Sequence, residues 1–487
     1  MTDWSNSGLD KTNKGAVTII GAGLVGCYLA HRLLEENFVI TLIDMGGMDE
    51  PVPQVLADKA IPIFSKEIYR GGTSEGRVFG IGGTSVVWGG AMIPPSRFER
   101  HLCPDIDPSA QDRVLKTFAI KGIFASAEKS KHLDKRNILW PAFHRKNTRS
   151  LLDTRHPNLG LIEKASVREI KFEKRLAKTL VIQRGLTSFE LDCSESTVIL
   201  CAGMLESTRI LSTPIVDHAN CEKDESAKSF PSRDFKDHIS APLAYLKPKS
   251  SKSMDYLLLK RPWGFESIRY DFGYGDCTGF VNVQFTREDS DAFSLLRDLA
   301  LHVQSSQLGI SFFLSMLRLV PKIGWVCRFF WSFYIRGYVL PPDGSKLFLN
   351  CAMAKLTYGS ISIEKDEMSI EWEVTADDER NFLEVGRQVV IEMRKQLGAI
   401  FDIEELSDEQ ISCNLRGTSE VFHPNGSVPF GGGLHEIDEN TRFKKSENLF
   451  VISSAIFPEG GVSSPSFALL CLAEQLVGTL AFDRKHG

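Results

Sequence analysis

Residues 17–44 read VTIIGAGLVGCYLAHRLLEENFVITLID, and this stretch decides the fold. A short β-branched run ends at the turn Gly21-Ala22-Gly23, and Gly26 follows within a helical pattern of apolar residues. A second apolar run, residues 39–43, closes on Asp44. Strand, glycine turn, helix and strand in this order, with an acid about 20 residues after the first glycine, predict a dinucleotide-binding βαβ unit.

The three glycines of this unit have different expected roles. Gly21 would make the tight turn, and Gly23 would let a pyrophosphate approach the backbone at the helix N-terminus. Gly26 would let the helix pack closely on the strand, while Asp44 would accept hydrogen bonds from a ribose. The motif does not distinguish FAD from NAD, and a glycine-rich structural turn is the alternative interpretation.

The composition places limits on the rest of the chain. Its 487 residues exceed one ordinary core, so two large domains are expected. A net charge of −5 gives no global reason to expect a nucleic-acid partner. Ten cysteines without CxxC spacing favour a reduced, cytoplasmic protein with no metal site, and the polar residues 1–15 contain no apolar run typical of a secretory signal.

A second glycine cluster, GRVFGIGGTSVVWGG, occupies residues 76–90. Six of its fifteen residues are glycine, and they surround Thr84 and Ser85 and lie on both sides of Trp88. Glycines gather where the backbone takes positive φ or comes close to a ligand. The cluster therefore predicts either a ligand-binding loop or a tight turn in a core.

Five stretches, taken in order, resemble the glucose-methanol-choline (GMC) oxidoreductase family of FAD-dependent alcohol oxidases and dehydrogenases. They are residues 21–26 with Asp44, the cluster at 76–90, VILCAGMLESTRIL at 198–211, HPNGSVPFGG at 423–432, and NLFVISSAIFPEGGVSSPSFALLCLAEQL at 448–476. Val167 and the pair Asp237-His238 are shorter matches. The matching stretches cover about half of the chain, and the middle matches poorly.

The resemblance implies that the glycine cluster brings backbone N–H groups to the pyrophosphate of FAD. Thr84 and Ser85 would add hydroxyl donors, Trp88 would pack near the isoalloxazine, and Val167 would lie at the adenine. The matching motifs imply four more cofactor contacts, at Gly82, Gly83, Ala202 and Gly203.

His423 opens the His-x-x-Gly-Ser motif and is the expected catalytic base, although a lone histidine is often structural. A histidine near neutral pH suits removal of a hydroxyl proton, and FAD would take the hydride. The family's second His or Asn is replaced here by Ser464. Serine is no base near pH 7, so Ser464 has a positioning role beside His423, or the pair is incomplete, or catalysis has been lost.

Two further departures concern the flavin itself. Ser453 stands where the family commonly has an aspartate, which puts one flavin contact in doubt. Val87 stands where pyranose oxidases have a covalently flavinylated histidine. The sequence therefore predicts FAD that is bound without a covalent link.

Residues 306–342 form an apolar stretch in which Trp, Phe and Tyr alternate with basic residues. Pro321, Lys322 and Arg328 interrupt it, so a transmembrane helix is not expected. A hairpin in a membrane interface and a buried lid of the substrate domain are equally weighted interpretations. The first would make the cytoplasmic protein a peripheral membrane protein.

The predicted fold is α/β, with a doubly wound Rossmann-like FAD-binding domain from residues 1–240 and 406–487 and an α+β substrate domain from 241–405. The predicted reaction is oxidation of a CH–OH group, in a sugar or polyol by analogy with the tryptophan-bearing loop of sugar-oxidising relatives. Three alternatives remain: a flavin-binding protein without alcohol oxidation, an NAD-dependent dehydrogenase, and a scaffold whose middle segment docks a membrane or partner.

Overall fold

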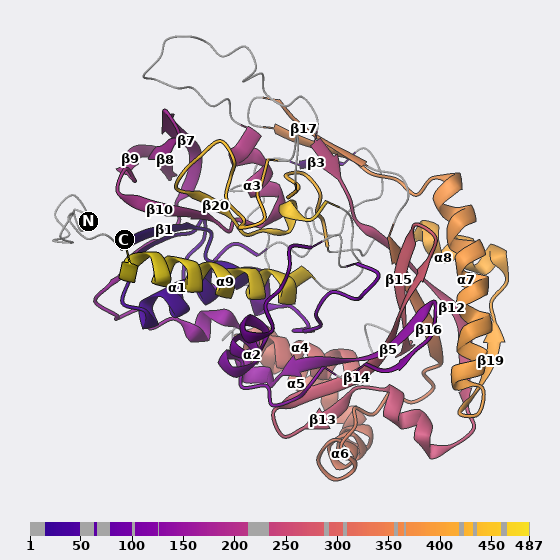
Figure 1. The fold of residues 1–487 in the computed structure, drawn as a ribbon. Coiled ribbons are helices and arrows are strands. Elements are labelled where there is room, and N and C mark those ends of the chain that lie inside the picture. The colour runs from indigo at the N-terminus through magenta and orange to yellow at the C-terminus, as the bar shows by residue number, and fades with distance from the viewer. Residues whose placement is uncertain are drawn as a thin grey trace.

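The computed structural model describes residues 15–48, 63–65, 78–99, 103–124, 126–212, 233–286, 292–304, 309–354, 359–364, 367–417, 423–431, 436–458 and 465–486. Within them a parallel sheet and several antiparallel sheets lie side by side (Figure 1). The predicted α/β fold class is confirmed.

The parallel sheet is built from both ends of the chain. Its five strands, in spatial order, are β20 (Leu449–Val451), β10 (Ser196–Leu200), β1 (Ala16–Ile20), β2 (Val39–Ile43) and β6 (Leu159–Ile162). The three inner strands are short apolar runs that are largely buried, as expected for a parallel sheet covered by helices, while the edge strand β6 is half-buried. The first strand, β1, is central, and the last, β20, is an edge.

Helices from distant parts of the sequence cover this sheet. They are α1 (Leu24–Glu35), α2 (Pro108–Thr117), α3 (Gly203–Ser212) and α9 (Pro465–His486). Figure 1 shows α1 and α9 packed side by side, and α2 also contacts α9. A three-stranded antiparallel sheet lies beside them, with strands β7 (Ser166–Glu173), β8 (Leu176–Arg184) and β9 (Thr187–Asp192).

A large antiparallel sheet forms the other side of the molecule. Its main path is β19 (Phe401–Glu405), β12 (His238–Pro248), β16 (Leu347–Ala354), β15 (Cys277–Phe285), β14 (Gly264–Tyr274), β5 (Leu133–Pro141) and β4 (Ser126–Lys129), with β13 (Leu259–Arg261) paired to β14. Helices α7 (Ala376–Leu397) and α8 (Asp408–Gly417) lie beside this sheet (Figure 1). Thr375 and Asp378 form a capping box that begins α7.

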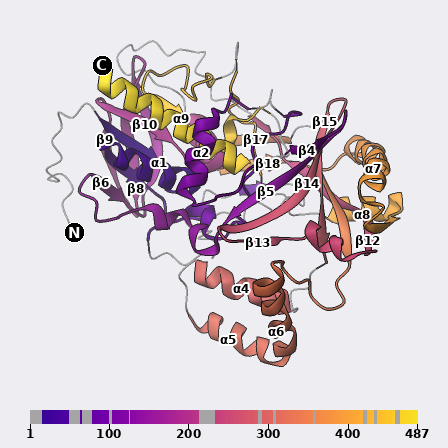
Figure 2. The ribbon, with the colours of Figure 1, turned by 60° about the horizontal axis from the view of Figure 1, so that its bottom comes forward.

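The remaining elements are a small sheet and three helices. The small sheet is β11 (Arg233–Phe235), β17 (Gly359–Glu364), β18 (Glu367–Glu371) and β3 (Ile63–Ser65). The helices α4 (Ala292–Gln304), α5 (Ile310–Leu319) and α6 (Ile323–Trp331) project from the rest of the molecule (Figure 2).

The strand pairing adds structure where the sequence predicted little. Residues 100–160, which carry none of the motifs quoted above, contain α2, β4 and β5. β5 contains several charged residues and pairs with β14 over nine residues. These strands join the large antiparallel sheet although they lie within 1–240, and the predicted domain boundaries stay a prediction.

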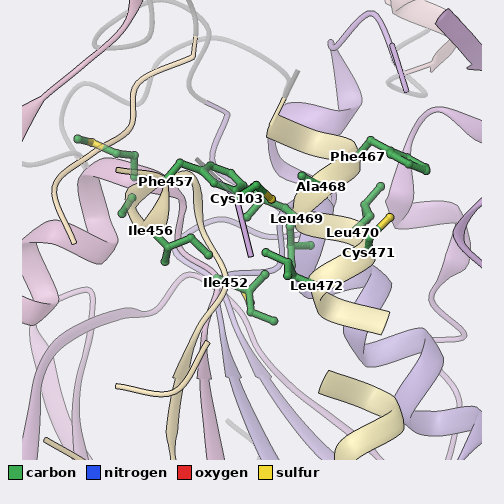
Figure 3. Close-up of a cluster of buried hydrophobic side chains, with 14 of the residues drawn as sticks. Cys103, Ile452, Ile456, Phe457, Phe467, Ala468, Leu469, Leu470, Cys471 and Leu472 are labelled. Atoms are coloured by element: carbon green, nitrogen blue, oxygen red, sulfur yellow. The ribbon is translucent and has the colours of Figure 1, made fainter. Parts of the chain in front are cut away.

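The main hydrophobic core runs continuously from the parallel sheet to the antiparallel sheet. Figure 3 shows part of it, where Leu469 and Leu472 of α9 lie toward Ile452, which follows β20. Burial of one such side chain contributes about 1.5–3 kcal/mol. This packing fixes the start of α9 against the carboxyl end of the parallel sheet.

Two helical stretches are long and apolar enough to cross a membrane when judged by length and composition alone. The first, Pro465–His486, is α9, whose apolar part lies mostly in the core. The second, Ile310–Arg336, joins α5 and α6 through a 3₁₀ turn at Val320–Lys322 and ends in a π-helical turn. Only 11% of its most apolar part is buried.

Candidate functional site

A cavity of about 750 Å³ lies at the carboxyl ends of the parallel strands, where open α/β sheets bind their ligands. Its size falls within the range of about 300–1,000 Å³ for small-molecule and cofactor sites. Eleven of the predicted site residues line it: Gly21, Gly23, Asp44, Gly83, Thr84, Ser85, Trp88, Val167, Ala202, Gly203 and His423. Gly26 and Gly82 lie outside its lining, and Ser464 lies outside the described residues.

The glycines of the first turn occupy three different environments. Gly21 has a φ of +96°, and a Cβ there would approach the Cys201 carbonyl oxygen to 2.7 Å. A Cβ at Gly26 would come within 1.9 Å of the Gly21 carbonyl oxygen, so this glycine allows α1 to pack on the turn. Gly23 precedes α1 as its N-cap, and a Cβ there would meet no protein atom within 4 Å. Gly23 therefore leaves space beside the helix N-terminus.

The Asp44 carboxylate holds two loops together, a role that the sequence did not reveal. Its Oδ2 accepts the Ala22 N–H at 2.8 Å, and its Oδ1 accepts the N–H groups of Gly46 at 2.8 Å and Gly80 at 3.1 Å. Burial raises the pKa of Asp44 above its ordinary value, although these three N–H groups lower it. A ribose hydroxyl would share a carboxylate that already positions both glycine loops.

The second glycine loop touches the first directly. The Gly82 N–H donates to the Ala22 carbonyl oxygen at 2.8 Å, and Gly82 has a φ of +99°. A Cβ at Gly83 would lie 2.7 Å from the Gly23 Cα. The two clusters quoted from the sequence therefore form one continuous wall of the cavity, and a side chain at Gly83 would push them apart.

The polar residues of this loop differ in what they offer a ligand. The Ser85 hydroxyl is already hydrogen-bonded within the protein, because Oγ donates to the Gly82 carbonyl oxygen at 2.6 Å and bonds Thr148 Oγ1 at 2.8 Å. Thr84 is exposed and lines the cavity. The Trp88 Nε1–H donates to the Lys146 carbonyl oxygen at 2.8 Å, which orients the indole in the cavity wall.

Three helices begin at the cavity. Leu24 of α1, Gly203 of α3 and Ser466 of α9 all line it. The first N–H groups of a helix lack partners within the helix, and the helix dipole adds partial positive charge there. The arrangement suits an anionic ligand such as a pyrophosphate.

Val167 and Arg209 form another part of the lining. The Arg209 Nη2 donates to the Val167 carbonyl oxygen at 2.6 Å, and its Nε pairs with Glu206 at 2.8 Å. Both charged residues belong to α3 and are buried. The sequence reasoning missed this pair, because a charged residue in a helix pattern ordinarily indicates a solvated face.

His423 lies beside His238, which begins β12. Their rings are stacked with centroids 5.1 Å apart and an interplanar angle of 22°. Asp237 positions both residues: its Oδ2 accepts the His423 N–H at 3.3 Å, and its Oδ1 accepts the His238 N–H at 2.8 Å. The Asp237-His238 pair was noted in the sequence, but only the fold places it against His423.

Burial keeps both histidines neutral. Desolvation, followed by the nearby positive charge of Arg269, lowers the pKa of His423 to about 4. Desolvation, then His423 and Arg269, lowers the pKa of His238 well below 6.5. At neutral pH the His423 ring therefore has an unprotonated nitrogen and can accept a proton.

The residues present fit a flavin dinucleotide. Ser453 lines the cavity and is buried, and its hydroxyl finds no hydrogen-bond partner among the described residues. The buried Ser166 hydroxyl, which also lines the cavity, likewise has no hydrogen-bond partner among the described residues. Buried polar groups are ordinarily paired, so these hydroxyls indicate that a polar ligand belongs in the cavity.

Comparison with known proteins first gave negative results at the level of sequence. No family model matches the chain, and no curated protein matches it. Solved structures, in contrast, match over nearly the whole length.

Two similar structures are oxidases. Pyridoxine 4-oxidase from Mesorbium loti has a TM-score of 0.55 and 17% sequence identity, covering 96% of this chain and 99% of its own. Formate oxidase from Aspergillus oryzae RIB40, studied for the effect of an R554A substitution on FAD modification, has a TM-score of 0.55 and 11% identity. That match covers 98% of this chain and 100% of the formate oxidase. At these identities the likeness establishes the fold.

Proposed function

We propose that this chain, which has the fold of the glucose-methanol-choline oxidoreductases, is a flavin-dependent oxidoreductase that acts on a CH–OH group. The observation that carries the proposal is one cavity of about 750 Å³ enclosed by two touching glycine loops and three helix N-termini, with a neutral histidine in its lining. The oxidases of similar fold support the same class of chemistry.

FAD is the proposed cofactor. Gly23, Gly83 and Gly203 would let its pyrophosphate approach the backbone. The Ser453 hydroxyl, which has no hydrogen-bond partner among the described residues, would bond a polar group of the cofactor. We propose that the flavin is held without a covalent bond, because Val87 in the lining has no nucleophilic atom. An NAD-dependent dehydrogenase explains the first glycine turn but not the second loop packed against it.

His423 is the proposed base. When bound, FAD accepts the hydride that leaves the substrate carbon. The hydroxyl proton passes to the unprotonated ring nitrogen of His423, so the CH–OH group becomes a carbonyl. His238 stacks on the His423 ring, and Asp237 accepts the backbone N–H of His423 and so positions the main chain there. We retain a sugar or polyol as the proposed substrate class, with Ser464 as a hydrogen-bond partner of the substrate oxygen.

A flavin-binding protein without alcohol oxidation is the second candidate. The low pKa of His423 supports it, because a base of pKa about 4 has a weak affinity for the departing proton at neutral pH. The two candidates differ in one observable, which is reduction of the bound flavin by an alcohol.

The test is the visible absorption spectrum of the purified protein, recorded before and after denaturation and filtration. Flavin bands that pass the filter support non-covalent FAD, and bands that stay with the protein contradict it. Anaerobic mixing with sugars, polyols, pyridoxine and formate would then separate the candidates, because only an oxidoreductase bleaches the flavin. A protein that takes up no FAD at all contradicts the proposal.

A glycine substitution tests the location of the flavin. Gly23→Ala adds a methyl group that meets no protein atom within 4 Å, so stability should change by no more than about 1 kcal/mol. FAD should bind at least about tenfold more weakly, because the methyl group enters the space proposed for the pyrophosphate. Thermal unfolding and FAD titration measure the two effects.

Gly478→Ala is the matched control. Gly478 lies in α9, also has open space at its Cβ, and is absent from the cavity lining. It should bind FAD like the parent protein. Equal FAD affinity of the two variants would refute the proposed position of the pyrophosphate.

A further inference from the structure

The described residues between 310 and 335 present a continuous series of apolar side chains to solvent. The α5–α6 surface is defined as Ile310, Phe313, Leu314, Met316, Leu317, Val320, Ile323, Phe330, Trp331, Tyr334 and Ile335, all of which are exposed. Figure 2 shows α5 and α6 at the outer end of the projecting helices. Contiguous apolar patches of this kind mark interaction sites in soluble proteins.

The opposite side of the same helices is packed. Leu319, Trp325 and Phe329 are buried together with Ala292 and Leu295 of α4 in a second, smaller core. The Trp325 Nε1–H also donates to the Pro341 carbonyl oxygen at 3.2 Å. The helices are therefore held in place by one apolar face while the other is left exposed, so the surface is not a lid buried over the substrate domain.

The segment is held at both ends by the same body of the protein. Val339 donates to the Leu258 carbonyl oxygen at 2.9 Å and Lys260 donates to the Gly337 carbonyl oxygen at 2.6 Å, while α4 packs on the preceding side. The 3₁₀ turn at Val320–Lys322 divides the apolar stretch into α5 of ten residues and α6 of nine. Each helix is about 15 Å long or less, half of the roughly 30 Å bilayer core. This geometry suits a segment that lies in an interface.

Charge identifies the partner. Residues 310–336 contain Arg318, Lys322, Arg328 and Arg336 and no acidic residue, and Arg328 pairs with Asp343 just beyond the segment. Basic residues among Trp, Tyr and Phe are typical of segments at the surface of an anionic membrane. A second copy of this chain would instead bring identical cations together across a two-fold interface.

We propose that the α5–α6 surface docks on an anionic lipid bilayer, with its apolar side chains in the headgroup region and its cations at the lipid phosphates. Docking would bring the bilayer close to the cavity wall. Gln304, the last residue of α4, donates its Nε2–H to the Ser85 carbonyl oxygen at 3.0 Å and accepts the Asn147 Nδ2–H at 3.0 Å. This inference goes beyond the proposed function and does not depend on it.

Co-sedimentation with lipid vesicles tests the proposal. The full-length protein should sediment with vesicles of phosphatidylglycerol and phosphatidylcholine, and much less with phosphatidylcholine alone. The triple variant Leu317→Ser, Ile323→Ser, Trp331→Ser should bind at least about tenfold more weakly. Arg318→Gln and Lys322→Gln should each weaken binding to the anionic vesicles about fivefold.

A matched control changes exposed apolar residues elsewhere. The triple variant Leu186→Ser, Ile391→Ser, Phe482→Ser removes side chains that are likewise exposed, and it should bind as the parent does. Parent protein that stays in solution with both vesicle types overturns the proposal. So does self-association that the first triple variant abolishes without any vesicle binding. Co-sedimentation does not require bound flavin. The vesicle result therefore tests membrane binding even if the proposed oxidoreductase function is wrong.

Discussion

At the scale of single residues, the site depends on groups whose protonation is set by burial. His423 and His238 stack in an environment that contains Arg269, and both are held neutral by desolvation. Glycine positions are equally specific, since Gly23 leaves space toward the cavity and Gly26 leaves none. The same residue type therefore serves two different purposes three positions apart.

His423→Asn should lower kcat by about 10²–10⁴-fold while FAD binding is kept. In the parent enzyme kcat/KM should fall as the pH drops through about 4, because protonation of His423 removes the acceptor for the substrate proton. Steady-state rates measured from roughly pH 3 to pH 8, on both sides of the expected value, test this. If kcat/KM of the His423→Asn variant still falls at low pH in the same way, the titrating group is a different residue.

At the scale of elements, the first and last helices of the described chain are tied by a buried ion pair. Glu474 of α9 accepts Arg32 Nε at 2.9 Å and Nη2 at 3.0 Å, and the Tyr28 hydroxyl at 2.9 Å. Glu474 is 4% exposed. Glu474 also accepts Arg113 Nη1 at 3.4 Å, so its carboxylate is the buried partner of two arginines and a tyrosine.

Glu474→Ala should lower the free energy of unfolding by about 3 kcal/mol, because it leaves the Arg32 charge without its buried partner. Glu35→Ala removes an exposed partner of the same arginine and should cost no more than about 1 kcal/mol. Urea unfolding followed by circular dichroism compares the two. Equal losses would mean that burial of the α1–α9 pair has no energetic consequence.

At the scale of the whole molecule, the cavity is assembled from segments that are hundreds of residues apart. β1, β10 and β20 are adjacent in the parallel sheet, so their carboxyl ends meet at one edge. β12 belongs to the antiparallel sheet and carries His238 to the same place. Proton binding to this site is consequently coupled to folding of the entire chain.

Stability should decrease as the pH falls from 6.5 toward 4. The folded pKa of His423 lies below its ordinary value, so the unfolded chain binds protons first and acid favours unfolding. Protonation of His423 should lower the free energy of unfolding by roughly 3 kcal/mol at the low end of this pH range. Melting temperatures measured between these pH values should fall less steeply in His423→Asn than in a variant of the exposed His486. Parallel slopes in the two variants would contradict the assignment.

The sequence alone was sufficient for the elements whose signal is local. Residues 17–44 encode strand, turn, helix and strand within one short segment, so the α/β class was predictable. The motifs also pointed to eleven of the residues that line the cavity. In each case the determinant is the backbone freedom of glycine or the spacing of neighbouring apolar residues.

Only the tertiary structure decided how distant groups meet. β5 joins the large antiparallel sheet by pairing with β14, which lies far along the chain, and β4 joins it only through β5. The stacking of His238 on His423, the Asp44 bonds to both glycine loops and the inward bond of Ser85 all join residues far apart in the chain. The exposure of the α5–α6 surface was equally undetermined, because an apolar helix has the same sequence whether its outer face meets a core or a bilayer.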